Sequence, residues 1–164
     1  MEARMEPFDT IDLIRLQDSY SNNDIEELIS LTHVHPNEPE LWDVLGDIMQ
    51  TCKEDRPIED SLKCYNKALE CDNSFAAAYE SIGWALDTYF DDFDGAEKNF
   101  LLALKHGAGD TARIGLSRVL AQTGRANAAM NCLDDCHDQT RSDLVEMRRE
   151  IAEGIWFSES QETA

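Results

Sequence analysis

The sequence predicts an all-α fold built from helical hairpins, and three observations support this prediction. Apolar residues recur along most of the 164-residue chain at the spacing that places them on one face of a helix. No run of alternating Val, Ile or Thr between turn residues indicates a strand. A motif also recurs: the glycines Gly46 and Gly83 lie 37 residues apart, and the alanines Ala68 and Ala103 lie 35 apart. A period in this range is typical of a helical repeat array.

Two helices are expected before the repeated motif. The first covers residues 9–20, where apolar residues stand at mixed helical spacing. The second covers residues 24–33, with Asn23 or Asp24 as its N-cap, because a short polar side chain can accept a hydrogen bond from the first turn. Pro36 then stops the chain and separates this helical pair from the next.

Four helices follow, at about 38–52, at 57–71, from Asn73 or Ser74 to about 89, and at 94–107. Pro57 suits a first helical turn, and the acidic residues after it suit the positive end of the helix dipole. Asp94 and Glu97 have the spacing of a capping box at the start of the fourth helix, which Gly107 ends.

The last three helices are expected at 110–124, at 125–136, and from Thr140 or Ser142 to 157, the first capped by Asp110. The final helix carries an apolar stripe at helical spacing, formed by Leu144, Met147, Ile151 and Ile155. Because the connections are short, successive helices are expected to be antiparallel neighbours. The chain is therefore interpreted as about four hairpins, the last of them incomplete.

Two copies of the motif are clear and a third is degenerate. Each clear copy has an aromatic, an apolar residue and a glycine, then a small residue, an aromatic and an alanine: Trp42, Leu45, Gly46, Ser61, Tyr65 and Ala68, and Tyr79, Ile82, Gly83, Ala96, Phe100 and Ala103. In the third copy Ser117 stands in place of the glycine and Cys136 in place of the alanine. Residues 37–138 thus resemble the tetratricopeptide repeat (TPR) family. The resemblance implies an α-α superhelix in which Gly46 and Gly83 permit close helix approach, with capping helices at both ends.

On this basis the whole chain is predicted to be one helical-repeat domain. Its predicted parts are an N-terminal helical pair or cap at 8–36, repeats at 37–73, 74–108 and 109–139, a C-terminal capping helix at 140–157 and a flexible tail at 158–164.

The resemblance also implies a ligand-binding concave face, formed by the first helix of each hairpin. The positions that match are Glu40, Asp43, Asp47 and Gln50 in the first repeat, Ala77, Glu80, Trp84 and Asp87 in the second, and Ile114 and Arg118 in the third. One subclass of the family grips a peptide carboxylate with cations and amides at such positions. Asp43 and Asp47 would repel a carboxylate, so the predicted ligand is basic or mixed, with Trp84 as a candidate anchor. The alternatives are that Trp84 packs under the next helix and that the acids are an ordinary solvated face.

The charge balance limits the classes of partner. With 14 Lys and Arg against 34 Asp and Glu, the net charge is −20. Such a chain is unsuited to a nucleic-acid backbone or an anionic membrane, and it attracts basic proteins or peptides. The leading hypothesis is therefore a protein-interaction adaptor. One alternative is an acidic inhibitor or immunity-type protein that mimics nucleic-acid charge. A second is a structural module that self-associates through the C-terminal Ile155, Trp156 and Phe157.

The sequence predicts neither catalysis nor a bound cofactor. Cys132, Cys136 and His137 are the best metal candidates, but no second ligand pair stands at matching spacing, so no metal site is expected. Phosphate-binding loops and nucleophile elbows are also missing from the sequence. The N-terminus has no secretory signal pattern and the cysteine count of five is odd, which predicts reduced thiols in the cytoplasm.

Overall fold

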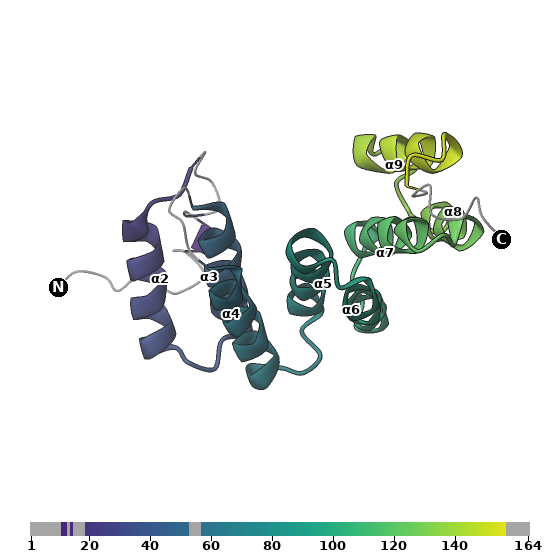
Figure 1. Ribbon diagram of the computed structural model, residues 1–164. Helices are drawn as coiled ribbons and strands as arrows, with labels where there is room; N and C mark the ends of the chain where they lie inside the picture. The colour runs from purple at the N-terminus through teal and green to yellow at the C-terminus, as the bar shows by residue number, and fades with distance from the viewer. Residues whose placement is uncertain (1–10, 13, 15–18, 53–56, 157–164) are drawn as a thin grey trace. The chain divides into compact units, whose positions relative to one another are not determined.

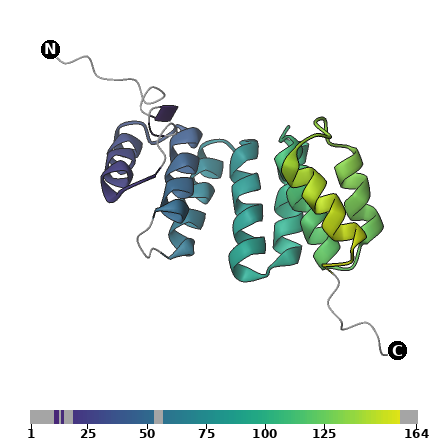
Figure 2. The same ribbon diagram turned by 90° about the horizontal axis from the view of Figure 1, so that it is seen from above.

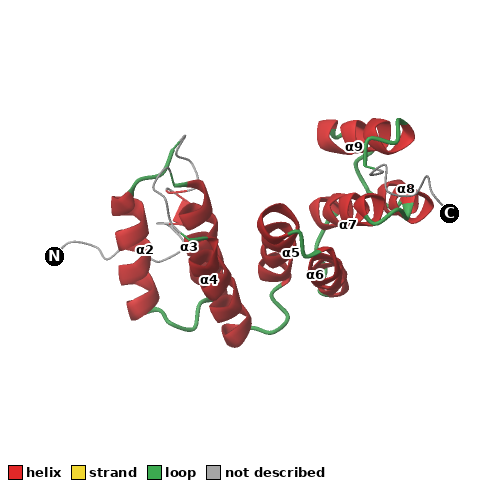
Figure 3. Cartoon of the chain, viewed as in Figure 1, coloured by secondary structure: helices red, strands yellow, loops and turns green. Residues whose placement is uncertain are grey.

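The computed structural model describes residues 11–12, 14, 19–52 and 57–156. In these residues the regular structure is helical, without strands, which confirms the all-α prediction (Figures 1 and 3). Among the described residues, no helix combines the length and the apolar character that crossing a membrane requires. The helices are α2 (Asn22–Val34), α3 (Pro39–Thr51), α4 (Ile58–Cys71), α5 (Ala76–Phe90), α6 (Phe93–Lys105), α7 (Asp110–Gln122), α8 (Ala126–Asp134) and α9 (Ser142–Ala152).

The chain divides into two compact units, residues 1–81 and residues 82–164. Unit 1 contains α2, α3, α4 and the start of α5. Unit 2 contains the rest of α5 and α6 to α9, and the boundary lies within α5. The repeat boundaries inferred from the motif stay predictions.

The N-cap of α2 differs from the one expected. Ser21, rather than Asn23 or Asp24, is the cap, and Asp24 lies in the first turn. The Asp24 carboxylate accepts hydrogen bonds from the Ser21 backbone N–H at 2.8 Å and from its hydroxyl at 2.6 Å. The prediction was wrong because Asn22 and Asn23 already have helical conformation, and the acid therefore closes a capping box from inside the helix.

In unit 1, α3 packs against both α2 and α4 (Figure 2). The core contains the fully buried Leu28, Leu41 and Tyr65. The closest approach is at Gly46, where an added Cβ would lie 2.5 Å from Cε1 of the Tyr65 ring. A glycine is therefore required sterically at this position, because the buried ring occupies the space of a side chain.

In unit 2, the Phe100 ring of α6 lies between two glycines. An added Cβ at Gly83 of α5 would lie 2.8 Å from Cε1 of this ring, and one at Gly115 of α7 would overlap its Cζ. The repeat motif predicted a close helix approach at Gly83, but it predicted neither that the Phe100 ring fills this position nor that Gly115 approaches the same ring. Ser117, which replaces the glycine in the third copy, is fully buried and donates its hydroxyl hydrogen bond to the Ala129 carbonyl of α8 at 2.9 Å. The hydroxyl is thus satisfied where the two helices meet.

Two caps in unit 2 also differ from expectation. The cap of α6 is Asp92, whose carboxylate accepts from the Gly95 N–H at 3.0 Å, so the capping box expected at Asp94 and Glu97 is wrong. Phe93 is already helical, which moves the start of α6 towards the N-terminus, and Glu97 instead pairs with Arg125, Nη1 to Oε1 at 2.9 Å.

Asp110 is the first residue of α7, after Gly109 as the N-cap, and not the cap itself. Its carboxylate accepts the backbone N–H groups of His137 and Asp138, each at 2.9 Å. These bonds lower the pKa of Asp110 to about 2. Asp110 thereby ties the start of α7 to the connection between α8 and α9.

Candidate partner-binding surface

Four of the predicted binding positions lie on α3, in unit 1. Glu40, Asp43, Asp47 and Gln50 share one side of the helix because three or four residues separate each from the next. Asp47 is exposed and Glu40 and Gln50 are half-buried, whereas Asp43 is only 4% exposed. Asp43 therefore contributes charge to this side of α3 more than contact area.

A hydrogen-bond network fixes the C-terminal half of this side. The buried Tyr65 hydroxyl of α4 donates to Oδ1 of Asp47 at 2.9 Å and accepts from Nε2 of Gln50 at 2.9 Å. Burial raises the pKa of the Tyr65 phenol, and the negative charges of Asp47 and Asp43 raise it further. The phenol consequently stays protonated, and both side chains of α3 are held in defined orientations.

The start of α5 joins the same part of unit 1. The Ser81 hydroxyl donates to Oδ1 of Asp43 at 3.3 Å. Of the two predicted positions in this segment, Ala77 is exposed and Glu80 is half-buried. We call the predicted positions in unit 1 the acidic face; they are Glu40, Asp43, Asp47, Gln50, Ala77 and Glu80.

In unit 2, Trp84 packs edge-to-face against Phe100. The ring centroids are 5.3 Å apart and the planes meet at 78°. The indole remains half-buried. This contact fixes the ring against the core, as the packing alternative expected, and leaves part of its surface accessible to solvent.

Asp87 and Arg118 form a buried ion pair in unit 2. Nε of Arg118 lies 3.1 Å from Oδ2 of Asp87, whose side chain is fully buried, whereas that of Arg118 is 30% exposed. Burial raises the pKa of the Asp87 carboxyl, and the charge of Arg118 opposes this rise. The repeat motif places each residue on its helix, but gives no signal that the two meet.

The C-terminal segment covers Arg118. The Trp156 ring lies over the guanidinium group, 5.3 Å from the Cζ atom to the ring centroid. The Trp156 Nε1–H donates to Oε2 of Glu150 at 3.1 Å. Of the residues expected to mediate self-association, Trp156 is thus partly engaged within unit 2 and Ile155 is 57% exposed, while Phe157 lies outside the described residues.

Ile114 is only 4% exposed, so this predicted groove position contributes to the core of unit 2. Within the described ranges, no group of three or more His, Cys, Asp or Glu is arranged to hold a metal ion. The five cysteines are free thiols, and burial raises the pKa of Cys64 to about 11. At neutral pH this thiol is protonated and a poor nucleophile.

Comparison with known proteins identifies the fold. No family model matches the sequence, and no curated protein sequence matches it. Among solved structures, the chain is similar to TTC0263, a thermophilic TPR protein of Thermus thermophilus, with a TM-score of 0.65, 17% identity, and coverage of 83% of this chain and 73% of that one. It is also similar to YrrB, described as a TPR protein with an unusual peptide-binding site, with a TM-score of 0.61, 21% identity, and coverage of 79% and 61%. The chain therefore has a TPR-like helical-repeat fold, as its motif predicted.

Proposed function

We propose that this chain is a non-catalytic interaction module that binds a basic or mixed segment of a partner protein along the acidic face of unit 1. Its fold supports a protein or peptide ligand, since extended helical repeats present a continuous binding surface. The similarity to YrrB, whose description includes a peptide-binding site, favours a peptide segment. The positions predicted in unit 2 stay predictions.

The observation that carries the proposal is the fixed arrangement of two carboxylates on α3. Asp43 and Asp47 lie one helical turn apart, and each accepts a hydrogen bond from the hydroxyl of another helix, Ser81 of α5 and Tyr65 of α4. Side chains that are already oriented lose little conformational freedom on binding. A Lys or Arg of the ligand would contact the exposed Asp47 in the field of the nearly buried Asp43. Hydrogen bonds to charged groups are each worth about 1.5–3 kcal/mol.

We further propose that the partner is neither a nucleic acid nor an anionic membrane and that the chain acts in the cytoplasm. At a net charge of −20, nucleic acids and anionic membranes are repelled. The five free thiols fit a reducing compartment such as the cytoplasm.

Binding of two labelled peptides tests the proposed function. One is a short fluorescein-labelled peptide of alternating Lys and Ala, and the other has Glu in place of Lys. Fluorescence anisotropy is measured at about 0.15 M salt, where the Debye length of about 8 Å screens distant charges. We expect the basic peptide to bind the wild-type chain and the acidic peptide to bind far more weakly.

The double variant Glu40→Gln/Asp47→Asn removes two charges from the acidic face. The amide oxygen introduced at position 47 can still accept the Tyr65 hydrogen bond, so the helix pair is retained. Binding of the basic peptide should weaken by about tenfold or more, which corresponds to about 1.4 kcal/mol. The control Glu26→Gln/Glu27→Gln makes the same charge change at exposed positions of α2. Equal weakening by both double variants, or equal binding of the two peptides, would show that the proposed site is wrong.

A further inference from the structure

Two lysines differ from the other described cations of this acidic chain in forming no salt bridge with a described residue. The described part of the chain contains ten Lys and Arg side chains, and eight of them lie within salt-bridge distance of a carboxylate. The eight are Lys63, Lys67, Arg113, Arg118, Arg125, Arg141, Arg148 and Arg149. Lys98 and Lys105 make no such pair with a described residue, although acids outnumber bases 34 to 14 in the chain.

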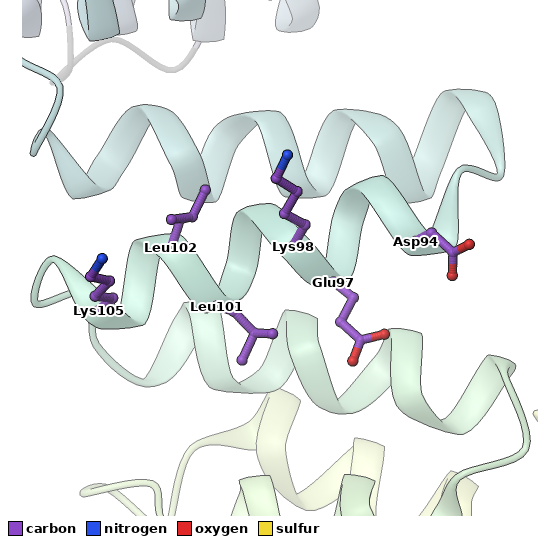
Figure 4. Close-up of a pocket in the computed structure, with 6 residues that line it drawn as sticks. All are labelled: Asp94, Glu97, Lys98, Leu101, Leu102 and Lys105. Carbon is purple, nitrogen blue, oxygen red and sulfur yellow. The ribbon is translucent and has the colours of Figure 1, made fainter.

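Both lysines lie on one face of α6. Lys98, Leu101, Leu102 and Lys105 follow the spacing i, i+3, i+4, i+7, which places them on the same side of a helix. Together with Asp94 and Glu97 they line a shallow depression of about 380 Å³ (Figure 4). Leu101 is 50% exposed, although it is a large apolar residue. We call Lys98, Leu101, Leu102 and Lys105 the α6 patch.

Neither acid of the depression forms a salt bridge with a lysine of the patch. Both oxygens of Glu97 are engaged by the guanidinium of Arg125. Asp94 lies in the first turn of α6, one turn before Lys98, whereas Lys105 lies in the last turn. The helix dipole accounts for a cation at the position of Lys105. It does not account for Lys98 in mid-helix, where Asp94 one turn earlier can contribute a favourable charge, and neither effect accounts for the exposed leucine between the two cations.

We propose that the α6 patch is a second interaction surface, which docks an acidic amphipathic helix of a partner protein. Seven residues of helix correspond to a rise of about 10 Å, so Lys98 and Lys105 can pair with two carboxylates that lie two turns apart on the incoming helix. An apolar side chain between those carboxylates would cover Leu101 and Leu102. This is the anchor spacing by which amphipathic helices are recognised. Because the charge of the patch is opposite to that of the acidic face, the two surfaces select different ligands.

The probe for this surface is a synthetic fluorescein-labelled helical peptide in which two Glu residues, two turns apart, flank a pair of leucines. Its counterpart carries Lys in place of both Glu residues. Anisotropy is again measured at about 0.15 M salt, because the net charge of −20 would repel an acidic peptide more strongly at low ionic strength. We expect saturable binding of the Glu peptide that depends on the α6 patch, whereas any binding of the Lys peptide, at the acidic face, should be unchanged by substitutions in the patch.

Two sets of variants locate the site. Lys98→Glu/Lys105→Glu should weaken binding of the Glu peptide by about tenfold or more, and Leu101→Gln should weaken it without changing any charge. The control Lys63→Glu/Lys67→Glu makes the same charge change at exposed positions of α4 and should shift affinity by less than about twofold. Far-UV circular dichroism checks that each variant folds. The patch variants should still bind the basic Lys-Ala peptide, so failure at one surface is distinguishable from failure at the other.

Three outcomes would overturn the inference. They are no saturable binding of the Glu peptide up to about 1 mM, equal weakening by the two charge-reversal variants, and unchanged binding in Leu101→Gln. Sedimentation velocity adds a fourth. If the wild-type chain self-associates and Lys98→Glu/Lys105→Glu is monomeric, the patch is an interface between copies of this chain and not a docking site for an acidic helix.

Discussion

Replacement of Arg118 by Ala should destabilise unit 2, and more strongly at neutral than at acidic pH. The substitution removes the cation that lies 3.1 Å from the carboxylate of Asp87 and leaves this carboxylate in a fully buried position. It also removes the surface on which the Trp156 ring rests. We expect the loss of the ion pair to dominate, because an unpaired buried charge is far more costly than the loss of one partly exposed contact.

The distance between Arg118 and Asp87 determines how strongly Arg118→Ala destabilises unit 2. Two unit charges at 3.1 Å attract by about 5 kcal/mol at an effective dielectric constant of about 20. Breaking a buried pair on one side typically costs about 3–5 kcal/mol. Because the Arg118 side chain is 30% exposed, water can enter the space that it leaves and solvate part of the charge. We therefore expect Arg118→Ala to lower the free energy of unfolding by about 2–4 kcal/mol at pH 7.

The pH dependence follows from the direction of the pKa shift. Burial already raises the pKa of Asp87, and Arg118 is the main influence that opposes this rise. Without Arg118 the folded pKa rises further above the unfolded value of about 3.9. Between these two values the folded state binds more protons than the unfolded state, so stability falls as pH increases. The decrease in the free energy of unfolding caused by Arg118→Ala should consequently become smaller as the pH is lowered towards 4.

Urea unfolding followed by circular dichroism at several pH values between about 4 and 8 measures this effect. Arg118→Ala is compared with Asp87→Asn/Arg118→Ala, in which the buried group is neutral. The double variant should recover stability at pH 7 and have a smaller pH dependence than the single variant. The reasoning is refuted if Arg118→Ala unfolds at the wild-type midpoint at pH 7, or if the double variant is no more stable than the single one.

Two further predictions concern packing and a loop. Gly46→Ala should destabilise unit 1 by about 1–2 kcal/mol, because overpacking against the Tyr65 ring exceeds the gain in helix propensity. A wild-type urea midpoint for this variant would contradict this. Asp110→Asn should lower the Tm at pH 7, because the carboxylate that binds the His137 backbone has a pKa of about 2 and its contribution is fully present above about pH 4. The Tm difference from wild type should disappear as the pH falls from about 4 to about 2, and a pH-independent difference would exclude the carboxylate charge as its cause.

The sequence alone was sufficient to predict the helices from α2 to α9 and the close approach of the two helices of a hairpin, whereas the helix expected at 9–20 lies mostly outside the described residues. Residue spacing predicts a close helix approach at Gly46 and Gly83, because such an approach requires a missing side chain at a fixed offset along the chain. Only the structure shows that the rings of Tyr65 and Phe100 fill these two positions. The exact helix starts were predicted less well. Asp92 and Asp94 are chemically equivalent caps, and only the direction in which the chain enters α6 selects between them.

The tertiary structure alone decided which polar groups meet across hairpins. The pairing of Asp87 with Arg118, the position of Trp156 over Arg118 and the hydrogen bonds from the α8–α9 connection to Asp110 join residues that are far apart in the sequence. That Lys98 and Lys105, unlike the other described cations, form no salt bridge with a described carboxylate is likewise shown only by the structure. Periodicity specifies the face of a helix on which a side chain lies. The side chain that it meets depends on how successive helices pack, which no local spacing encodes.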